Sequence, residues 1–220
     1  MSTARTTVLT GLAALTATAA LAVTGCLPTL TTTPNAAGET AALDVLPVHP
    51  ENTTAPYDRD AWGDWTSHGR GCDTREIVLT EQSTGTRPGA DCRPVCPATG
   101  PACWHSPYDN VRLRDPSQVH IDHRVPLAEA HRSGGADWTE GERERFANDP
   151  ANLVAASASS NTAKGDGDPT RWKPDNVAEW CGYATAYITT KHTYRLSVDR
   201  RERDALAAML ATCTEQGGGA

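Results

Sequence analysis

The sequence predicts an α+β fold: a mostly helical single domain built around a short strand–strand–helix unit and stapled by disulfides. Residues 119–122 and 152–155 have the alternating or apolar character of short strands, and residues 157–164 form a helix-like segment directly after the second strand. Several other segments place capping residues in front of amphipathic patterns. Seven cysteines occur in a chain that starts with an export-type signal, which favours disulfides.

The first 25 residues have the character of an export signal. Arg5 precedes an apolar run from Val8 to Val23, which is shorter and weaker than a typical membrane-spanning helix. The junction Gly25-Cys26 resembles a bacterial lipobox, in which the cysteine is acylated and becomes the mature N-terminus. Cys26 would then hold the protein at the outer face of a membrane through lipid chains alone. The alternative is plain secretion with Cys26 unused.

Composition divides the rest of the chain into a tether, a domain and a tail. Residues 26–41 are rich in Thr, Pro and Ala and show little periodicity, which predicts a flexible tether. Residues 42–215 form one segment that is long enough to bury a core. Residues 216–220 are mostly glycine and predict a disordered tail.

The cysteines behind Cys26 predict three disulfides. They are even in number, and the export signal places them in an oxidising compartment. Six cysteines allow fifteen pairings. We predict the pairs Cys72 with Cys92, Cys96 with Cys103 across a Pro/Gly-rich insertion, and Cys181 with Cys213 between two C-terminal helices. The alternative is a zinc knuckle, but the chain has no Cys-x-x-Cys pair.

The elements ahead of residue 119 are expected to be short. Residues 57–65 are aromatic and charged and predict a loop with a short helix, whose tryptophans belong to the core. Asp73 is placed to cap a helix over residues 74–79. Residues 111–114 alternate in polarity and predict a strand.

The stretch from Val119 to Leu127 places an acid and a base at the end of a strand. Asp122 and His123 are adjacent, so in an extended backbone their side chains point to opposite sides. Pro126 forces a bend directly after them. A carboxylate suits Mg²⁺, Mn²⁺ or Ca²⁺, and a neutral histidine can take a proton from water. The plainer alternative is that Asp122 caps the next helix and His123 is a loop residue.

Two helices are expected between the two strands. The first begins after Pro126 and stops at Gly134-Gly135, and the second begins with a capping box over Thr139 to Glu142. Arg143 and Arg145 alternate with glutamates, which indicates a solvated face rather than a DNA-binding patch.

The second strand leads into a short helix that ends at Gly165, a residue suited to a left-handed C-cap. Asn161 and Lys164 are three residues apart, so they share one face of this helix. Further on, Asp175 is placed to start a long helix, and Asp199 begins a capping box for the last one.

The pattern Asp122-His123-x-x-Pro126, then Asn152-Leu153, then Asn161-x-x-Lys164-Gly165-Asp166 resembles the HNH, or ββα-metal, endonuclease motif. More narrowly, it is similar to a secreted HNH family that shares its domain with the C-terminal part of GmrSD-type restriction endonucleases. The resemblance extends from about residue 42 to the end and is carried by further short motifs: Leu46-Pro47-Val48, Tyr57-Asp58-Arg59, Cys72-Asp73-Thr74-Arg75, Ala128-Glu129-Ala130, Arg132-Ser133-Gly134, Phe146 to Pro150, and Asp168-Pro169 with Trp172.

The resemblance implies metal-assisted hydrolysis of phosphodiester bonds. Asp122 and Asn161 would hold one divalent ion, most readily Mg²⁺, with Mn²⁺ or Ca²⁺ as alternatives. His123 would deprotonate the attacking water, and Asn152 would orient the imidazole by a hydrogen bond. His120 lies two residues before Asp122; it faces either the metal or solvent.

Three cations are expected to contact phosphate. Lys164 and Arg124 lie in or next to the motif, and Arg75 matches a position that recurs in the family. A guanidinium that reaches the site could hold a phosphate through two hydrogen bonds. For Arg75, the alternative is a structural salt bridge.

The charge balance limits the class of substrate partner. The formal charge of −7 becomes −8 if Arg5 leaves with the signal, which argues against a protein that coats nucleic acid. A nuclease needs positive charge only locally, so the expected substrate is DNA, with RNA as an option, and no obligate protein partner is evident. Two other classes stay open: a catalytically silent surface-binding module, and a metal-dependent hydrolase of another phosphodiester.

Overall fold

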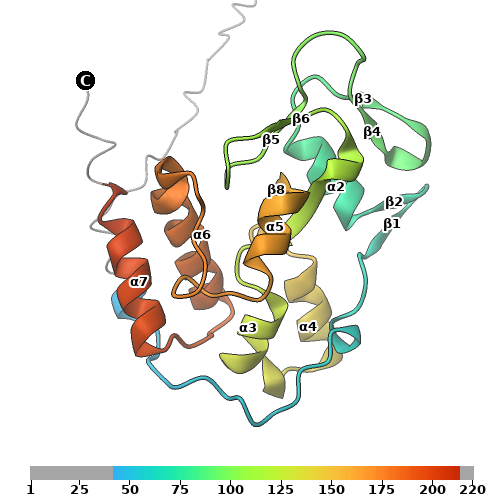
Figure 1. Ribbon diagram of the computed structural model, residues 1–220. Coiled ribbons are helices and arrows are strands. Elements are labelled where there is room, and N and C mark those ends of the chain that lie inside the picture. The colour runs from blue at the N-terminus through green and yellow to red at the C-terminus, as the bar shows by residue number, and fades with distance from the viewer. Residues whose placement is uncertain (1–41, 214–220) are drawn as a thin grey trace, which may run out of the picture. The chain divides into compact units, whose positions relative to one another are not determined.

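The computed structural model describes residues 42–213, which lie in one of the two compact units of the chain, Thr33–Ala220. The predicted signal, lipobox cysteine Cys26, tether and tail lie outside the described residues. Within the described part of the chain, the secondary structure is mixed helix and strand with three disulfides, so the predicted α+β class is confirmed (Figure 1).

The predicted strand–strand–helix unit is present. Strand β7 (Val119–His123) pairs antiparallel with β8 (Leu153–Ser157), and α5 (Ala158–Lys164) follows directly and packs on both strands (Figure 1). The register places Asp122 opposite Val154 and His123 opposite Leu153. Ser157 caps α5 by accepting from the Ser160 N–H. The helix ends where the backbone of Gly165 has a φ of 54°, a region that favours glycine.

The two faces of the two-stranded β7–β8 sheet contact two different cores. We call this sheet the hairpin below, although α3 and α4 lie between its strands in the sequence. Ile121 and Leu153 belong to a small core that also contains residues of α2 (Thr74–Glu81). Val154 and Ala156, on the other face, belong to the main core with the C-terminal helices. The alternation of side chains along a strand therefore separates Asp122 from His123, as expected for adjacent residues.

Four further helices complete the domain: α3 (Leu127–Arg132), α4 (Glu140–Ala147), α6 (Trp180–Thr193) and α7 (Arg200–Leu210). α6 packs on α7, as Figure 1 shows on the side away from α2. The predicted capping boxes are present at Thr139–Glu142 and Asp199–Glu202.

The start of α6 differs from the prediction. Asp175 does not begin the helix; a 3-10 turn (Val177–Glu179) precedes it, and α6 starts at Trp180. Asn176 explains the delay, because its backbone N–H donates to the Tyr108 carbonyl and its side chain donates to the Pro107 carbonyl. These two bonds hold residue 176 in an extended conformation outside the helix.

The N-terminal half of the domain consists of short hairpins around α2. The paired strands are β1 (Ser67–Gly69) with β2 (Cys72–Asp73), β3 (Arg87–Pro88) with β4 (Pro94–Val95), and β5 (Trp104–His105) with β6 (Arg112–Leu113). A 3-10 turn, η1 (Asp60–Trp62), is the short helix expected in residues 57–65.

The three disulfides have the predicted pairing. Cys72 is bonded to Cys92 and Cys96 to Cys103 among the hairpins, and Cys181 is bonded to Cys213. The first two bonds fix segments that contain little regular structure. The third joins the start of α6 to the turn that follows α7.

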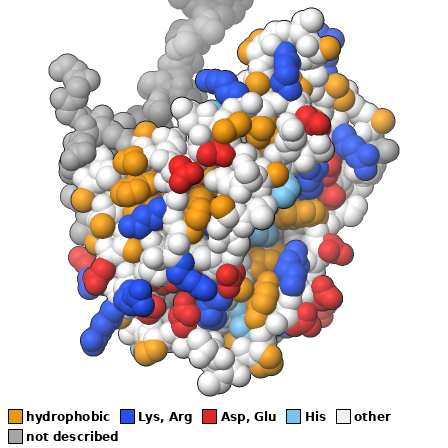
Figure 2. Space-filling view, viewed as in Figure 1, with side chains coloured by type: hydrophobic (Ala, Val, Ile, Leu, Met, Phe, Trp, Pro, Cys, Tyr) orange, Lys and Arg blue, Asp and Glu red, His pale blue; other side chains and the backbone are white. Residues whose placement is uncertain are grey.

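The surface carries both signs of charge. On the face drawn in Figure 2, Lys and Arg side chains alternate with Asp and Glu, and no continuous basic area forms on it. Among residues 42–213, no helix is both long and apolar enough to cross a membrane.

Candidate functional site

Asp122 is a buried carboxylate with two donors. Its side chain is on the α5 side of β7, and the residue is 5% exposed. The Tyr108 hydroxyl donates to Oδ2 at 2.6 Å, and Lys164 Nζ lies 3.0 Å from each carboxylate oxygen. A buried carboxylate is stable only with such partners. Tyr108 is fully buried and packs against Trp172 and Tyr183, so it gives Asp122 a rigid partner.

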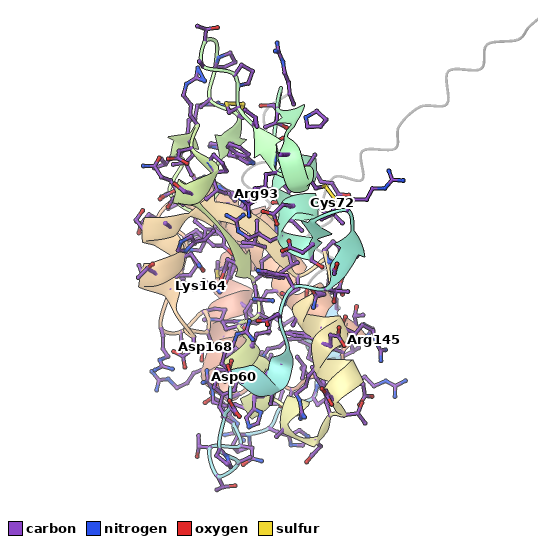
Figure 3. All side chains as sticks on the ribbon, turned by 90° about the vertical axis from the view of Figure 1, so that its right-hand side faces the viewer. Asp60, Cys72, Arg93, Arg145, Lys164 and Asp168 are labelled. Atoms are coloured by element: carbon purple, nitrogen blue, oxygen red, sulfur yellow. A yellow bond between two sulfur atoms is a disulfide. The ribbon has the colours of Figure 1, made fainter. Side chains whose placement is uncertain are left out.

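Lys164 faces inward rather than toward solvent. Its ammonium group donates to Asp122 and, at 2.7 Å, to the backbone carbonyl of His123. Burial lowers the pKa of Lys164, and the charge of Asp122 only partly opposes this effect. The shared face with Asn161 is confirmed, since both side chains contact β7. The ammonium group is engaged by Asp122 and the His123 carbonyl, and its expected contact with phosphate stays a prediction. Figure 3 shows Lys164 on α5.

The His123 imidazole is held on two sides. The Nε2 atom lies 2.7 Å from the Ala147 carbonyl oxygen, the last residue of α4, and so it donates there as N–H. The Trp65 ring stacks on the imidazole with a centroid distance of 5.5 Å and an interplanar angle of 9°. Burial lowers the pKa of His123 to about 4, against the opposing effects of the Ala147 hydrogen bond and of Asp122. The ring is therefore neutral at pH 7, with Nδ1 left as its acceptor.

Asn152 does not contact the imidazole. It is fully buried, and its amide forms two hydrogen bonds with the backbone of Val125: Val125 N donates to Oδ1 at 2.9 Å, and Nδ2 donates to Val125 O at 3.1 Å. The predicted hydrogen bond from Asn152 to His123 is thus absent, and Asn152 instead fixes the backbone of Val125, two residues after the histidine. The carbonyl that orients the ring comes from Ala147, which lies 24 residues away in sequence.

Asn161 contacts His120, which lies two residues before Asp122 in β7. The Asn161 Nδ2 atom is 3.2 Å from His120 Nδ1, which leaves the amide oxygen as an acceptor. His120 and Asp122 are two residues apart in β7 and so share its α5 face. A carboxylate and an amide oxygen are donors that suit a hard divalent ion, and Mg²⁺ keeps several waters, so it needs few protein ligands. The donor set therefore fits the expected metal.

Arg75 and Arg124 do not line a pocket with His123. Arg75 donates to Glu76 at 2.9 Å and to the carbonyls of Pro116 and Val119, at the end of β7 away from His123. These contacts support the structural alternative for Arg75. Arg124 Nη1 donates to the Leu153 carbonyl at 3.1 Å. Its expected contact with phosphate stays a prediction.

One shallow pocket brings the acid and the base together. It has a volume of about 200 Å³ and is lined by Tyr57, Arg59, Asp122, His123, Pro126, Leu127, Ala128, Gly165 and Asp166. Sequence reasoning placed Asp122 and His123 here but gave no role to Arg59, Trp65 or Tyr108. For Arg59, a signal was present in the recurring Tyr57-Asp58-Arg59 motif. For Trp65 and Tyr108, no local pattern indicates a contact with the site.

A second group of acids lies outside this pocket. Glu51, Asp168 and Asp199 bring carboxylate oxygens within 4.8 Å of one another, and within residues 42–213 they are the one such group of three potential metal ligands drawn from His, Cys, Asp and Glu. Each carboxylate already has a partner: Arg132 for Glu51, Thr170 for Asp168 and the Glu202 N–H for Asp199. These contacts indicate that the three side chains have a structural role.

The fold and the site define a disulfide-bonded α+β domain whose ββα unit presents a carboxylate and a fixed imidazole to one pocket. The family model described as "GmrSD restriction endonucleases, C-terminal domain" matches residues 102–209. The chain is also 39% identical over 206 residues to an uncharacterized secreted protein of Arthroderma benhamiae, which covers 93% of this chain and 98% of that relative. No solved structure matches the chain. The chain belongs to the family of GmrSD restriction endonuclease C-terminal domains, a nuclease-related family.

Proposed function

We propose that the protein is an exported, metal-dependent HNH endonuclease that hydrolyses phosphodiester bonds in DNA, with RNA as a second substrate to be tested. The observation that carries the proposal is that Asp122 and His123 line the same pocket although they point to opposite sides of β7. His123 is the last residue of the strand, so its ring reaches the pocket at the strand end. A carboxylate and a neutral imidazole at one solvent-accessible point suit metal-assisted hydrolysis.

His123 acts as the general base through Nδ1. Its Nε2–H is donated to the Ala147 carbonyl, which fixes the tautomer and leaves Nδ1 to accept a proton from the attacking water. Trp65 restricts rotation of the ring by stacking on it. Asn152 holds the Val125 backbone, so the turn after the base cannot relax. These contacts preorganise the base before substrate binds.

Asp122 and Asn161 would hold the divalent ion, most readily Mg²⁺, through their carboxylate and amide oxygens. When bound, the ion neutralises the scissile phosphate and stabilises the leaving oxygen. Lys164 and Tyr108 position the Asp122 carboxylate rather than the substrate. Partners of this kind, one step behind the ligand, orient it and tune its affinity for the metal.

Export is supported by two observations. The three disulfides require an oxidising compartment to form and persist. The relative from Arthroderma benhamiae is described as secreted. We extend the proposal to the outer face of the cell membrane, with Cys26 as the lipid-bearing residue. Mass spectrometry of the mature N-terminus tests this part: an unmodified chain released into the medium would favour plain secretion.

The experiment that tests the proposal is cleavage of supercoiled plasmid by the exported form, residues 27–220, with its disulfides formed. The arms are Mg²⁺, Mn²⁺, a chelator, and an RNA substrate in parallel. We expect metal-dependent nicking that the chelator abolishes. His123→Ala should abolish cleavage and keep metal binding, whereas Asp122→Ala and Asn161→Ala should weaken both. His192→Ala is the matched control, because His192 is an exposed histidine on α6.

The same experiment separates the two alternatives. A silent surface-binding module would bind metal or ligand yet cleave no phosphodiester. A hydrolase of another class would ignore DNA and RNA but cleave a small probe such as bis(p-nitrophenyl) phosphate in a His123-dependent way. Either result would remove the endonuclease proposal while leaving the family assignment in place.

A further inference from the structure

The pocket lacks the phosphate-binding cations that the sequence indicates. Lys164 is engaged by Asp122 and the His123 carbonyl, Arg75 lies toward the other end of β7, and Arg124 does not line the pocket. A phosphodiester backbone is an anion, and proteins bind it through arginine, lysine or backbone N–H groups. A side chain that adds positive charge beside Asp122 and His123 would therefore complement the proposed metal ion in binding the phosphate backbone.

Arg59 is a cation that lines this pocket together with Asp122 and His123. Its Nη1 donates to the Gly63 carbonyl at 2.8 Å, which fastens one arm of the guanidinium. Within the described part of the chain, Arg59 forms no ion pair with a carboxylate. A guanidinium has five N–H donors in a planar fork, so most of its donors stay available.

Two acids near Arg59, Asp166 and Asp58, have other partners. Asp166 lines the same pocket, but it forms an ion pair with Arg132 at 3.0 Å. Asp58 accepts from the backbone N–H of Asp60 at 3.0 Å and so is engaged in its own turn. The positive charge of Arg59 is thus left for an external anion.

The turn that carries Arg59 is anchored in the core. Trp62 is 1% exposed, packs against Phe146 of α4, and its backbone N–H donates to the Arg59 carbonyl at 3.1 Å. Arg143 of α4 donates to the Ala61 carbonyl at 3.0 Å. Gly63 has a φ of 70°, a conformation that glycine adopts readily, and its carbonyl receives the Arg59 side chain. Figure 3 labels Asp60 in this turn.

We propose that Arg59 binds a backbone phosphate of the nucleic acid beside the bond that is cut. The inference rests on the proposed function and adds the substrate-positioning cation to it. The fixed turn sets the guanidinium at the pocket wall, where its free donors can engage two non-bridging oxygens of one phosphate. The contact reads the sugar-phosphate backbone and not the bases, so it gives affinity without sequence preference.

Binding to a fluorescent 20-mer DNA, in the His123→Ala background with Mg²⁺, tests this inference. Arg59→Gln should weaken binding about tenfold and lower the slope of log K against log[salt] by roughly 0.7–0.9, the value for one phosphate contact. Arg59→Lys should keep most of the slope, because it keeps the charge. Arg201→Gln, which removes an exposed arginine on α7, is the matched control and should leave both values unchanged.

The outcomes separate the two proposals. If the wild type cleaves DNA but Arg59→Gln binds with unchanged affinity and salt slope, the Arg59 inference is wrong and the endonuclease proposal stands. If the wild type cleaves no nucleic acid and the His123→Ala form binds none, the proposed function fails, and the inference with it. Circular dichroism and retained Mn²⁺ affinity in Arg59→Gln exclude misfolding as the cause of a loss. If Arg59→Gln folds poorly, Arg59→Met, which keeps the aliphatic part of the side chain and removes the charge, is the deciding variant, with its salt slope as the readout.

Discussion

Two buried lysines define two regions with opposite uses of charge. Lys164, in the ββα unit, bonds to a single carboxylate, Asp122, and to a backbone carbonyl. Lys191, in α6, lies between two carboxylates, at 2.8 Å from Glu129 and 2.5 Å from Glu202. Both side chains have no exposed surface.

The pKa values of the two lysines shift in opposite directions. Burial alone would lower both. For Lys191, the attraction of Glu202 and Glu129 outweighs burial and raises the pKa, whereas one carboxylate does not outweigh burial for Lys164. In the helical region formed by α3, α6 and α7, two carboxylates thus surround one lysine. Lys191 of α6 cross-links Glu129 of α3 to Glu202 of α7. The candidate site holds Asp122 with one cation and one hydroxyl, and in our proposal a metal ion shares this carboxylate.

The largest effect is expected from Lys191→Met. The substitution leaves Glu129 and Glu202 buried without their cation, and breaking a buried ion pair in this way costs about 3–5 kcal/mol of the free energy of unfolding. Urea unfolding of the oxidised protein measures the loss. Lys173→Met is the matched control, because Lys173 forms a cation–π contact with the Trp180 ring, and its loss should cost about 0.5–1 kcal/mol. Equal losses in the two variants would contradict a cross-linking role for Lys191.

A smaller loss of stability is expected from Lys164→Met. Only one carboxylate loses its cation, and Asp122 still accepts from Tyr108 and borders the pocket. Because a divalent ion can take over the role of the missing charge, Mn²⁺ should raise the unfolding temperature of Lys164→Met more than that of the wild type. Thermal unfolding with and without Mn²⁺ measures this difference. No response to Mn²⁺ in either protein would argue against a shared Asp122.

Tyr108→Phe is expected to cost less stability than Lys164→Met, but to weaken metal binding clearly. Removing one hydroxyl costs about 0.5–1.5 kcal/mol of the free energy of unfolding, since Asp122 keeps Lys164. Loss of a partner behind a metal ligand typically weakens metal affinity about 10–100-fold. Titration calorimetry with Mn²⁺ measures the metal affinity, and urea unfolding measures the loss of stability. Tyr187→Phe removes the matching hydroxyl from Glu202 in the helical region and should leave the metal affinity unchanged.

The parts of this structure that sequence could predict depend on local signals. Strand β7, helix α5 and the capping boxes at Thr139 and Asp199 follow from alternation and from spacings of three or four residues. The even cysteine count in an exported chain predicts three disulfides, and the predicted pairing is present, although the count alone allows fifteen pairings.

The parts that sequence could not predict are contacts across space. Helical spacing placed Lys164 on the correct face of α5, but no local pattern reveals that Asp122 lies within 3.0 Å of it. Trp65 stacks on His123 although the two residues are 58 positions apart in the sequence. The Ala147 carbonyl takes the role predicted for Asn152, because α4 ends beside His123. Which cation is free for substrate depends on all these pairings at once.

The smallest effect on stability is expected from Glu51→Gln, which tests whether acidic side chains are in excess around Glu129 in the helical region. Burial, and then the nearby Glu129, raise the pKa of Glu51 to about 7, above its usual 4.5. The folded state therefore holds this proton more tightly than the unfolded chain, so the stability that it gives is full below pH 4.5 and is lost as the pH rises through 7.

Glu51→Gln removes the cost of ionisation and should unfold at a higher temperature than the wild type at pH 8, with little difference at pH 4.5. The amide oxygen can still accept a hydrogen bond from Arg132, although the ion pair with Arg132 is lost. Thermal unfolding at the two pH values measures the change, with Glu140→Gln on the exposed start of α4 as control. A Glu51→Gln protein that is less stable at pH 8 would mean that Arg132 neutralises Glu51 fully, and that the helical region carries no excess of negative charge at this position.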